Sequence, residues 1–263
     1  MYSRIRYNKS AGYGRVFNSY LSQFESEFCD KSDQIKSELA EIIYKNGKID
    51  ADAIQKEWFP TLKADIFISH SHKDLSIAKA VAGWLKEKLN LSAFIDYYAW
   101  GCCDELLKKI DDLYCKNKDN TYNYQLRNFT TSHVHTILSN ALTKIINNTE
   151  CILFINTPES VSVEKSILDV KEHKTTTSPW IFHELSISSS LPQIKPKRLQ
   201  KSHSLFENIE NIRDSKPSIE YTIDEQLKSF YSMSELDFEE WAEEASKRSS
   251  HPLDVLYKII KLK

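Results

Sequence analysis

The residues with the clearest potential for chemistry are Trp180 and Glu184, in the run Ser178-Pro179-Trp180-Ile181-Phe182-His183-Glu184-Leu185. Ser178 is a good N-cap residue and Pro179 fits the first helical position, so the run predicts a helix that begins at Pro179. Residues four apart share a helical face, which places Glu184 beside an aromatic ring. A carboxylate held in such a place can stabilise positive charge on a substrate. The alternative is an exposed glutamate on an ordinary amphipathic helix.

Three short, mostly apolar runs predict the buried strands that would position this helix. They cover residues 64–69, 92–96 and 151–155. Apolar residues at helical spacing lie between these runs, in residues 74–89, 106–113 and 133–148. The alternation of strand and helix favours an α/β fold with a parallel sheet and right-handed crossovers.

A polar segment follows each predicted strand. The first is residues 70–74, in which Asp74 is expected to cap the next helix; the others are residues 97–101, rich in Tyr and Trp, and residues 156–177. In an open parallel sheet, ligands bind outside the carboxyl ends of the strands. The helix of Glu184 begins after the third segment, and its N-terminal amides favour a carboxylate or a bound anion. We therefore expect a ligand site at this edge of the sheet.

The chain before residue 63 predicts a helical extension of the α/β domain. Residues 1–14 are interpreted as a polar arm, residues 16–43 carry apolar side chains at helical spacing, and Asn46-Gly47 ends that pattern. A short helix is expected from residue 50 to about residue 58. The main domain, residues 63–263, is expected to include a polar surface insertion at 116–132, a late strand at 218–223 and helices at 234–247 and 252–260.

The composition excludes several classes of protein. With 41% hydrophobic residues, 27% charged residues and a net charge of −2, the chain is globular and has no basic footprint for nucleic acid or anionic lipid. It has no apolar run near the ~20 residues of a membrane span and no signal-peptide core, so we expect a cytoplasmic protein. The five cysteines are expected to be free thiols. His70 and His72 could be two metal ligands, but no third ligand has suitable spacing, so no metal is expected.

Four segments, in this order, resemble the Toll/interleukin-1 receptor (TIR) domain family, in particular its bacterial branch. Residues 65–74, Asp-Ile-Phe-Ile-Ser-His-Ser-His-Lys-Asp, are similar to the first conserved box of these domains. Residues 93–96 with the loop of Trp100 resemble the second strand and its loop, and residues 151–155 resemble the third strand. Trp180-x-x-x-Glu184 matches the arrangement that carries the catalytic glutamate in NAD-consuming members.

The resemblance implies a flavodoxin-like doubly wound parallel sheet, and NAD as a substrate rather than a bound cofactor. It implies that Glu184 is catalytic and stabilises positive charge on the ribose while nicotinamide leaves. It also implies a nucleotide pocket lined by Phe67, Ser69, His70, Ser71, Asp74, Asp96, Trp100 and Trp180. Core packing is the alternative role for Phe67 and Trp180, and ordering of the following loop is the alternative for Asp96.

TIR enzymes commonly self-associate, so the resemblance implies a homo-oligomer formed through the TIR loops, and the aromatic residues of 97–101 suit a partner surface. The product would be ADP-ribose, a cyclic isomer or a conjugate that signals to a separate effector protein, as in the Thoeris systems of antiphage defence. Two alternatives stay open. One is a non-catalytic TIR module that assembles signalling complexes, and the other is an enzyme similar to nucleoside deoxyribosyltransferases.

Overall fold

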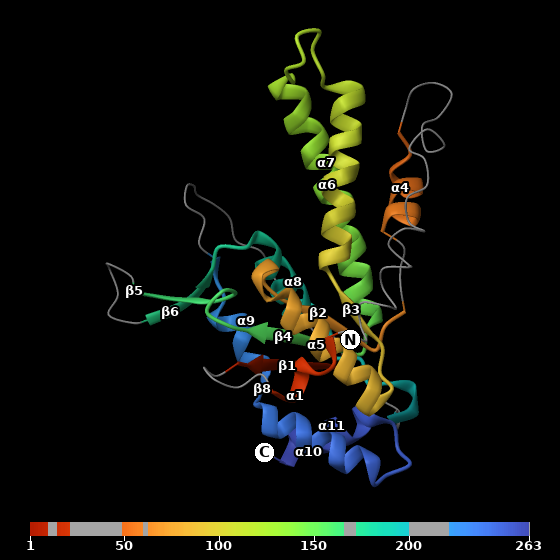
Figure 1. The fold of residues 1–263 in the computed structure, drawn as a ribbon, viewed down its shortest axis with the longest axis vertical. Helices are drawn as coiled ribbons and strands as arrows, with labels where there is room; N and C mark the ends of the chain where they lie inside the picture. The colour runs from red at the N-terminus through yellow and green to blue at the C-terminus, as the bar shows by residue number, and fades with distance from the viewer. Residues whose placement is uncertain (10–14, 22–48, 60–62, 166–171, 200–220, 263) are drawn as a thin grey trace. The chain divides into compact units, whose positions relative to one another are not determined.

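The computed structural model describes residues 1–9, 15–21, 49–59, 63–165, 172–199 and 221–262 (Figure 1). The chain forms two compact units. The first contains Met1–Phe24, Lys63–Ile95 and Ile146–Lys263, and the second contains Glu25–Leu62 and Asp96–Ile145. The start of the chain therefore belongs with the α/β unit, whereas the sequence-based division placed it in a separate extension.

A five-stranded, all-parallel sheet lies at the centre of the first unit, in the spatial order β3-β2-β4-β1-β8. The strands are β1 (Ser3–Asn8), β2 (Ile66–Ser69), β3 (Ala93–Ile95), β4 (Cys151–Asn156) and β8 (Tyr231–Met233). The three strands that the sequence predicts, β2, β3 and β4, lie in the order second-first-third, as in a flavodoxin-like sheet. The predicted α/β class with a parallel sheet is confirmed, and the strand order is compatible with a flavodoxin-like fold.

Strand β1 corrects the prediction that residues 1–14 are a polar arm. It pairs with β4 along its whole length, from Ser3 opposite Cys151 to Asn8 opposite Asn156. Ile5 and Tyr7 are fully buried and alternate with Arg4 and Arg6. Since alternate side chains of a strand point to opposite faces, the two arginines share the other face of the sheet.

Helices cover both faces of this sheet. The ring of Tyr7 makes edge-to-face contacts with Phe17 of α1 (Arg15–Asn18) and Phe238 of α10 (Glu235–Ser246). Trp84 of α5 (Leu75–Leu89) contacts the same two rings, so α1, α5 and α10 cover the Tyr7 face. Helix α8 (Pro179–Ser190) lies on the other side of the strands from α10 (Figure 1). The C-terminal helix α11 (Pro252–Leu262) packs against α10, and these two helices confirm the predictions for residues 234–247 and 252–260.

A small antiparallel sheet follows β4. Strand β6 (Glu172–Thr176) pairs with β5 (Ser162–Lys165) on one side and with β7 (Tyr221–Thr222) on the other. Helix α9 (Asp224–Lys228) comes directly after β7. The prediction of a long loop at residues 156–177 is therefore wrong. The sequence did not reveal these strands, because they are polar and show no hydrophobic alternation. Strand β7 confirms the end of the strand predicted at 218–223, and residues 218–220 lie outside the described residues.

The described part of the second unit consists of α4 (Ala51–Trp58), α6 (Tyr97–Tyr114) and α7 (Tyr124–Asn148). Helices α6 and α7 form a hairpin (Figure 1), in which Asp111 accepts hydrogen bonds from Arg127 Nε (2.8 Å) and Thr130 Oγ1 (2.6 Å). Helix α4 confirms the helix predicted near residues 50–58, while the apolar residues at 22–43 lie outside the described residues.

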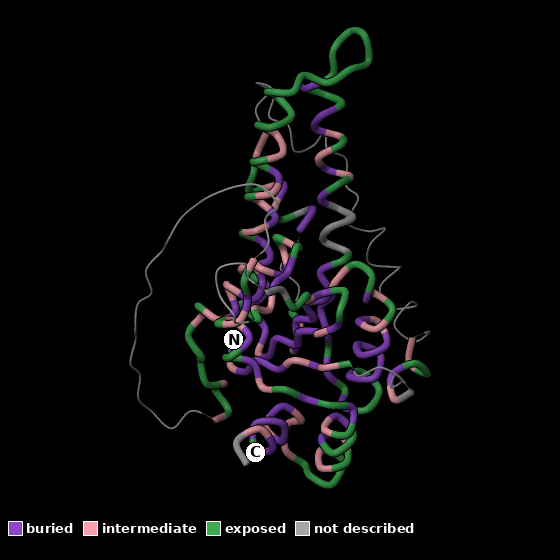
Figure 2. Tube along the Cα trace, turned by 90° about the vertical axis from the view of Figure 1, so that its left-hand side faces the viewer, coloured by how far each residue is buried: buried purple, intermediate pink, exposed green. Residues whose placement is uncertain are grey.

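The prediction that residues 97–101 form a loop is wrong, because they are the first turns of α6. The polar segment at 116–132, predicted as a surface insertion, is a turn followed by the beginning of α7. Figure 2 shows that the turn and the first part of α7 are exposed, so no periodic apolar stripe marks the beginning of this helix, in contrast to residues 133–148. Across the described ranges, no helix combines the length and the apolar character that crossing a membrane requires.

Candidate functional site

Helix α8 begins where the sequence predicts. The Ser178 hydroxyl caps it by accepting a hydrogen bond from the Ile181 backbone N–H (3.3 Å), and Pro179 occupies the first turn. The buried residues of the helix are Ile181, Glu184, Leu185 and Ser188, which recur at the spacing of one helical face. Glu184 has 0% exposure. The alternative of an ordinary exposed surface glutamate is therefore wrong. Glu184 lies on the inward face of α8.

Arg4 of β1 fixes the other end of α8. Its Nε donates a hydrogen bond to the Ser188 carbonyl (2.7 Å) and its Nη2 donates one to the Leu191 carbonyl (2.8 Å). The last carbonyls of a helix have no partner within the helix, and a cation there is favoured by the helix dipole. Arg4 is buried, and this burial lowers the pKa of its guanidinium. These contacts place α8 on the face of the sheet that carries Arg4.

The strand register brings two further predicted residues to the same face. Arg4 of β1 pairs with Ile152 of β4, which pairs with Phe67 of β2. Two residues further along the strands, Arg6 pairs with Phe154, which pairs with Ser69. Neighbouring residues in a parallel ladder point to the same side, so Phe67 and Ser69 lie on the face that α8 covers. Both side chains are fully buried. The structure thus places Phe67, Ser69 and Glu184 on one side of the sheet.

Phe67 and Ser69 differ in their surroundings. The Phe67 ring stacks on Phe94 of β3 with ring centroids 5.5 Å apart, which is a core contact. The hydroxyl oxygen of Ser69 is buried, and it has no hydrogen-bond partner among the residues that the structure describes. A buried hydroxyl without a partner costs free energy, which a polar ligand could recover. Ser69 therefore fits a binding role better than Phe67 does.

The loops after β2 and β4 are joined at the carboxyl edge of the sheet. Asp74 is buried, and its carboxylate accepts a hydrogen bond from Thr157 Oγ1 (2.5 Å), just beyond the end of β4. Lys73 and Glu159 form an ion pair across the same two loops (2.6 Å). The predicted N-cap role of the Asp74 side chain is wrong, because it bonds to Thr157 and not to the backbone of α5. This edge is the switch point between neighbouring strands, where ligands bind in open α/β sheets.

The remaining predicted residues lie in several places. His70 is buried immediately after β2, and the Ser71 hydroxyl accepts a hydrogen bond from the Lys73 backbone N–H (3.4 Å). Asp96 is buried immediately after β3, at the start of the second unit. Trp180 is half-buried, with its ring centroid 6.1 Å from that of His183. The side chain of Trp100 lies outside the described residues.

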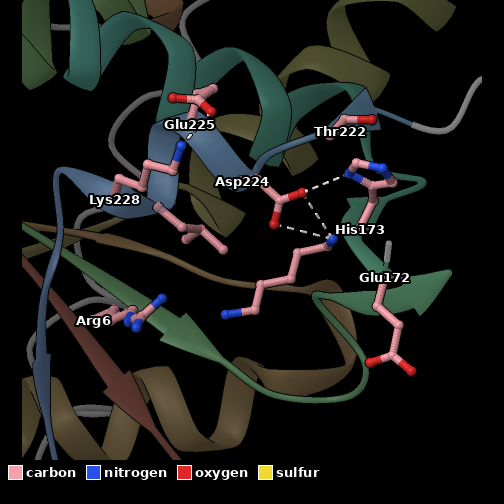
Figure 3. Close-up of a pocket in the computed structure, with 9 residues that line it drawn as sticks. Arg6, Glu172, His173, Thr222, Asp224, Glu225 and Lys228 are labelled. Carbon is pink, nitrogen blue, oxygen red and sulfur yellow. Dashed lines mark hydrogen bonds and ion pairs between the residues drawn. The ribbon is translucent and has the colours of Figure 1, made fainter. Parts of the chain in front are cut away.

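A cavity of about 580 Å³ lies in the first unit, and the sequence analysis did not predict it. It is lined by Arg6, Glu172, His173, Lys174, Thr222, Asp224, Glu225, Leu227 and Lys228 (Figure 3). The alternation of cationic and apolar residues in β1 was a usable signal for Arg6. The other lining residues lie on short polar strands and a short helix, whose sequences show no such alternation. In the described part of the chain, no cluster of three or more His, Cys, Asp or Glu side chains could hold a metal ion.

Comparisons with known proteins add no family. The chain matches no protein-family model, no curated protein and no solved structure. The TIR resemblance therefore stays a prediction from the sequence motifs.

Proposed function

We propose that this chain cleaves NAD at the bond between nicotinamide and ribose, with Glu184 as the catalytic residue. The observation that carries the proposal is the position of Glu184. It is a fully buried carboxylate on the inward face of a helix, over the sheet face that also holds Ser69. The resemblance of the sequence motifs to TIR domains supports the same assignment.

The chemistry needs only one carboxylate. Nicotinamide is already a cationic leaving group, so its departure needs no general acid. Positive charge then builds on the ribose, and a fixed carboxylate facing the ring stabilises it. That stabilisation is larger in a buried site than in water, because the local dielectric constant is lower. Water as acceptor gives ADP-ribose, and a group within the same molecule gives a cyclic isomer.

Access to Glu184 requires a conformational change. A carboxylate with 0% exposure cannot touch NAD until the groups that cover it move. Self-association of the chain would supply this movement, so we expect nicotinamide release per molecule to rise with protein concentration. A dilute monomer with full activity would contradict this part of the proposal. The product would then act as a signalling nucleotide in the cytoplasm, in antiphage defence.

A non-catalytic assembly module is the second candidate, and the α6–α7 hairpin favours it. Leu113, Tyr124 and Phe129 are 61%, 78% and 64% exposed on this hairpin. Large apolar side chains that stay exposed on one element can serve a protein interaction surface. A TIR module of this kind would recruit partners without consuming NAD.

Nicotinamide release separates the two candidates. Purified protein is incubated with NAD over a range of protein concentrations, beside the Glu184→Gln variant, which keeps the side-chain shape and removes its charge. We expect release by the wild type and not by the variant, and mass spectrometry then identifies the second product. An oligomer that forms at high concentration and leaves NAD intact would instead support the assembly module.

A further inference from the structure

The cavity lined by Arg6 and by residues of β6, β7 and α9 has the size of a small-molecule site. Its volume of about 580 Å³ lies within the roughly 300–1,000 Å³ common for ligand pockets. All of its lining residues belong to the first unit. Three of them are cations, Arg6, Lys174 and Lys228, and the lining also contains three carboxylates.

Two of these carboxylates bond to other residues of the lining. Asp224 accepts hydrogen bonds from His173 Nδ1 (3.1 Å) and from the Lys174 backbone N–H (3.2 Å). Glu225 pairs with Lys228, one turn along α9. Figure 3 shows the third carboxylate, that of Glu172, pointing away from Arg6. The negative charges of the lining therefore do not neutralise Arg6.

Two of the cations have no acceptor among the residues that the structure describes. The Nε of Arg6 is buried, and within the described ranges it has no hydrogen-bond partner. The ammonium of Lys174 forms no ion pair with any described residue, since only its backbone N–H bonds to Asp224. A buried guanidinium donor without an acceptor costs free energy, which an anion would recover. Arg6 and Lys174 line the same cavity from two different sheets.

We propose that this cavity binds the phosphate group of a phosphorylated small molecule of nucleotide size. The planar guanidinium of Arg6 offers two parallel donors that match phosphate oxygens, and Lys174 adds a point charge. A phosphate alone would leave most of the cavity empty, so the remainder of the ligand would lie against Leu227 and Thr222. This inference stands on the cavity alone and does not depend on the proposed activity of Glu184.

Calorimetric titration with AMP tests the proposal. AMP has the phosphate and the size, and it lacks the nicotinamide–ribose bond, so turnover cannot affect the result. We expect wild-type protein to bind AMP, inorganic phosphate to compete, and adenosine to bind at least about tenfold more weakly. Affinity for AMP should also fall as salt concentration rises.

Variants localise the binding. Arg6→Gln and Lys174→Gln are each expected to weaken AMP binding about tenfold or more. Lys174 lies on the small sheet, so its variant remains informative if Arg6→Gln does not fold. Lys258→Gln makes the same charge change at an exposed site on α11, and should leave the affinity within about twofold. Absence of AMP binding, or equal binding by Lys174→Gln and Lys258→Gln, would overturn the proposal.

Discussion

Replacing Arg4 with Met should detach the end of α8 from the sheet. Met keeps much of the apolar stem and removes two charged hydrogen bonds, to the carbonyls of Ser188 and Leu191. A hydrogen bond from a charged donor contributes about 1.5–3 kcal/mol, and losing a buried charge returns part of that. We therefore expect the free energy of unfolding to fall by about 3 kcal/mol. For a chain of this size that corresponds to a decrease in Tm of about 6–12 °C.

Urea and thermal unfolding followed by circular dichroism measure this loss. Arg248→Met is the matched control, because Arg248 is 44% exposed, lies just after the end of α10 and pairs with Glu244 in the last turn of that helix (2.9 Å). An exposed pair of this kind contributes less than about 1 kcal/mol. If Arg4→Met is no more destabilising than Arg248→Met, the two buried hydrogen bonds do not hold α8, and the placement of Glu184 over the sheet loses its support.

Two further predictions concern the same unit. Asp74→Ala and Thr157→Val, combined in a double-mutant cycle by urea unfolding, should show a coupling of about 1.5–3 kcal/mol, since they remove one buried hydrogen bond; additive effects would mean that the loops are not joined there. Burial raises the pKa of the Cys151 thiol to about 12, above its ordinary 9.0. Its stabilising contribution is therefore present below pH 9 and lost as pH rises toward 12. At pH 9, iodoacetamide should label Cys151 in urea and not in the native protein, by peptide mass spectrometry, and equal labelling would contradict its burial.

The elements predicted correctly are those whose local sequence features, such as a helix cap or an apolar run, agree with their place in the fold. Helix α8 carries a cap at Ser178 and Pro179 in its first turn, and both lie where the sequence predicts. Strands β2 and β4 are continuous apolar runs because helices cover both faces of the sheet. The burial of Glu184 did not follow from spacing, since its helix could have packed with another face inward.

Elements defined by distant partners were not predictable. Strand β1 contains Arg4 and Arg6, which in the sequence look like solvent-exposed residues. Only the structure shows that Arg4 bonds to carbonyls of α8 and that Arg6 lines the cavity. Strand β8 is three residues long and takes its identity from pairing with β1. The beginning of α7 is exposed and has no apolar stripe, and a pair between Arg127 and Asp111 helps to hold it to α6.

The most direct test of the central claim compares two buried glutamates in the same assay. Glu235 is buried against Tyr7 on the opposite face of the sheet, its carboxylate accepting a hydrogen bond from the phenol (2.6 Å). The rate of nicotinamide release from NAD is measured for the wild type, Glu184→Gln and Glu235→Gln at one protein concentration. We predict that Glu184→Gln lowers the rate about 100-fold or more and that Glu235→Gln leaves it within a few-fold. Unchanged release by Glu184→Gln, or an equal loss in both variants, would contradict a catalytic role for Glu184.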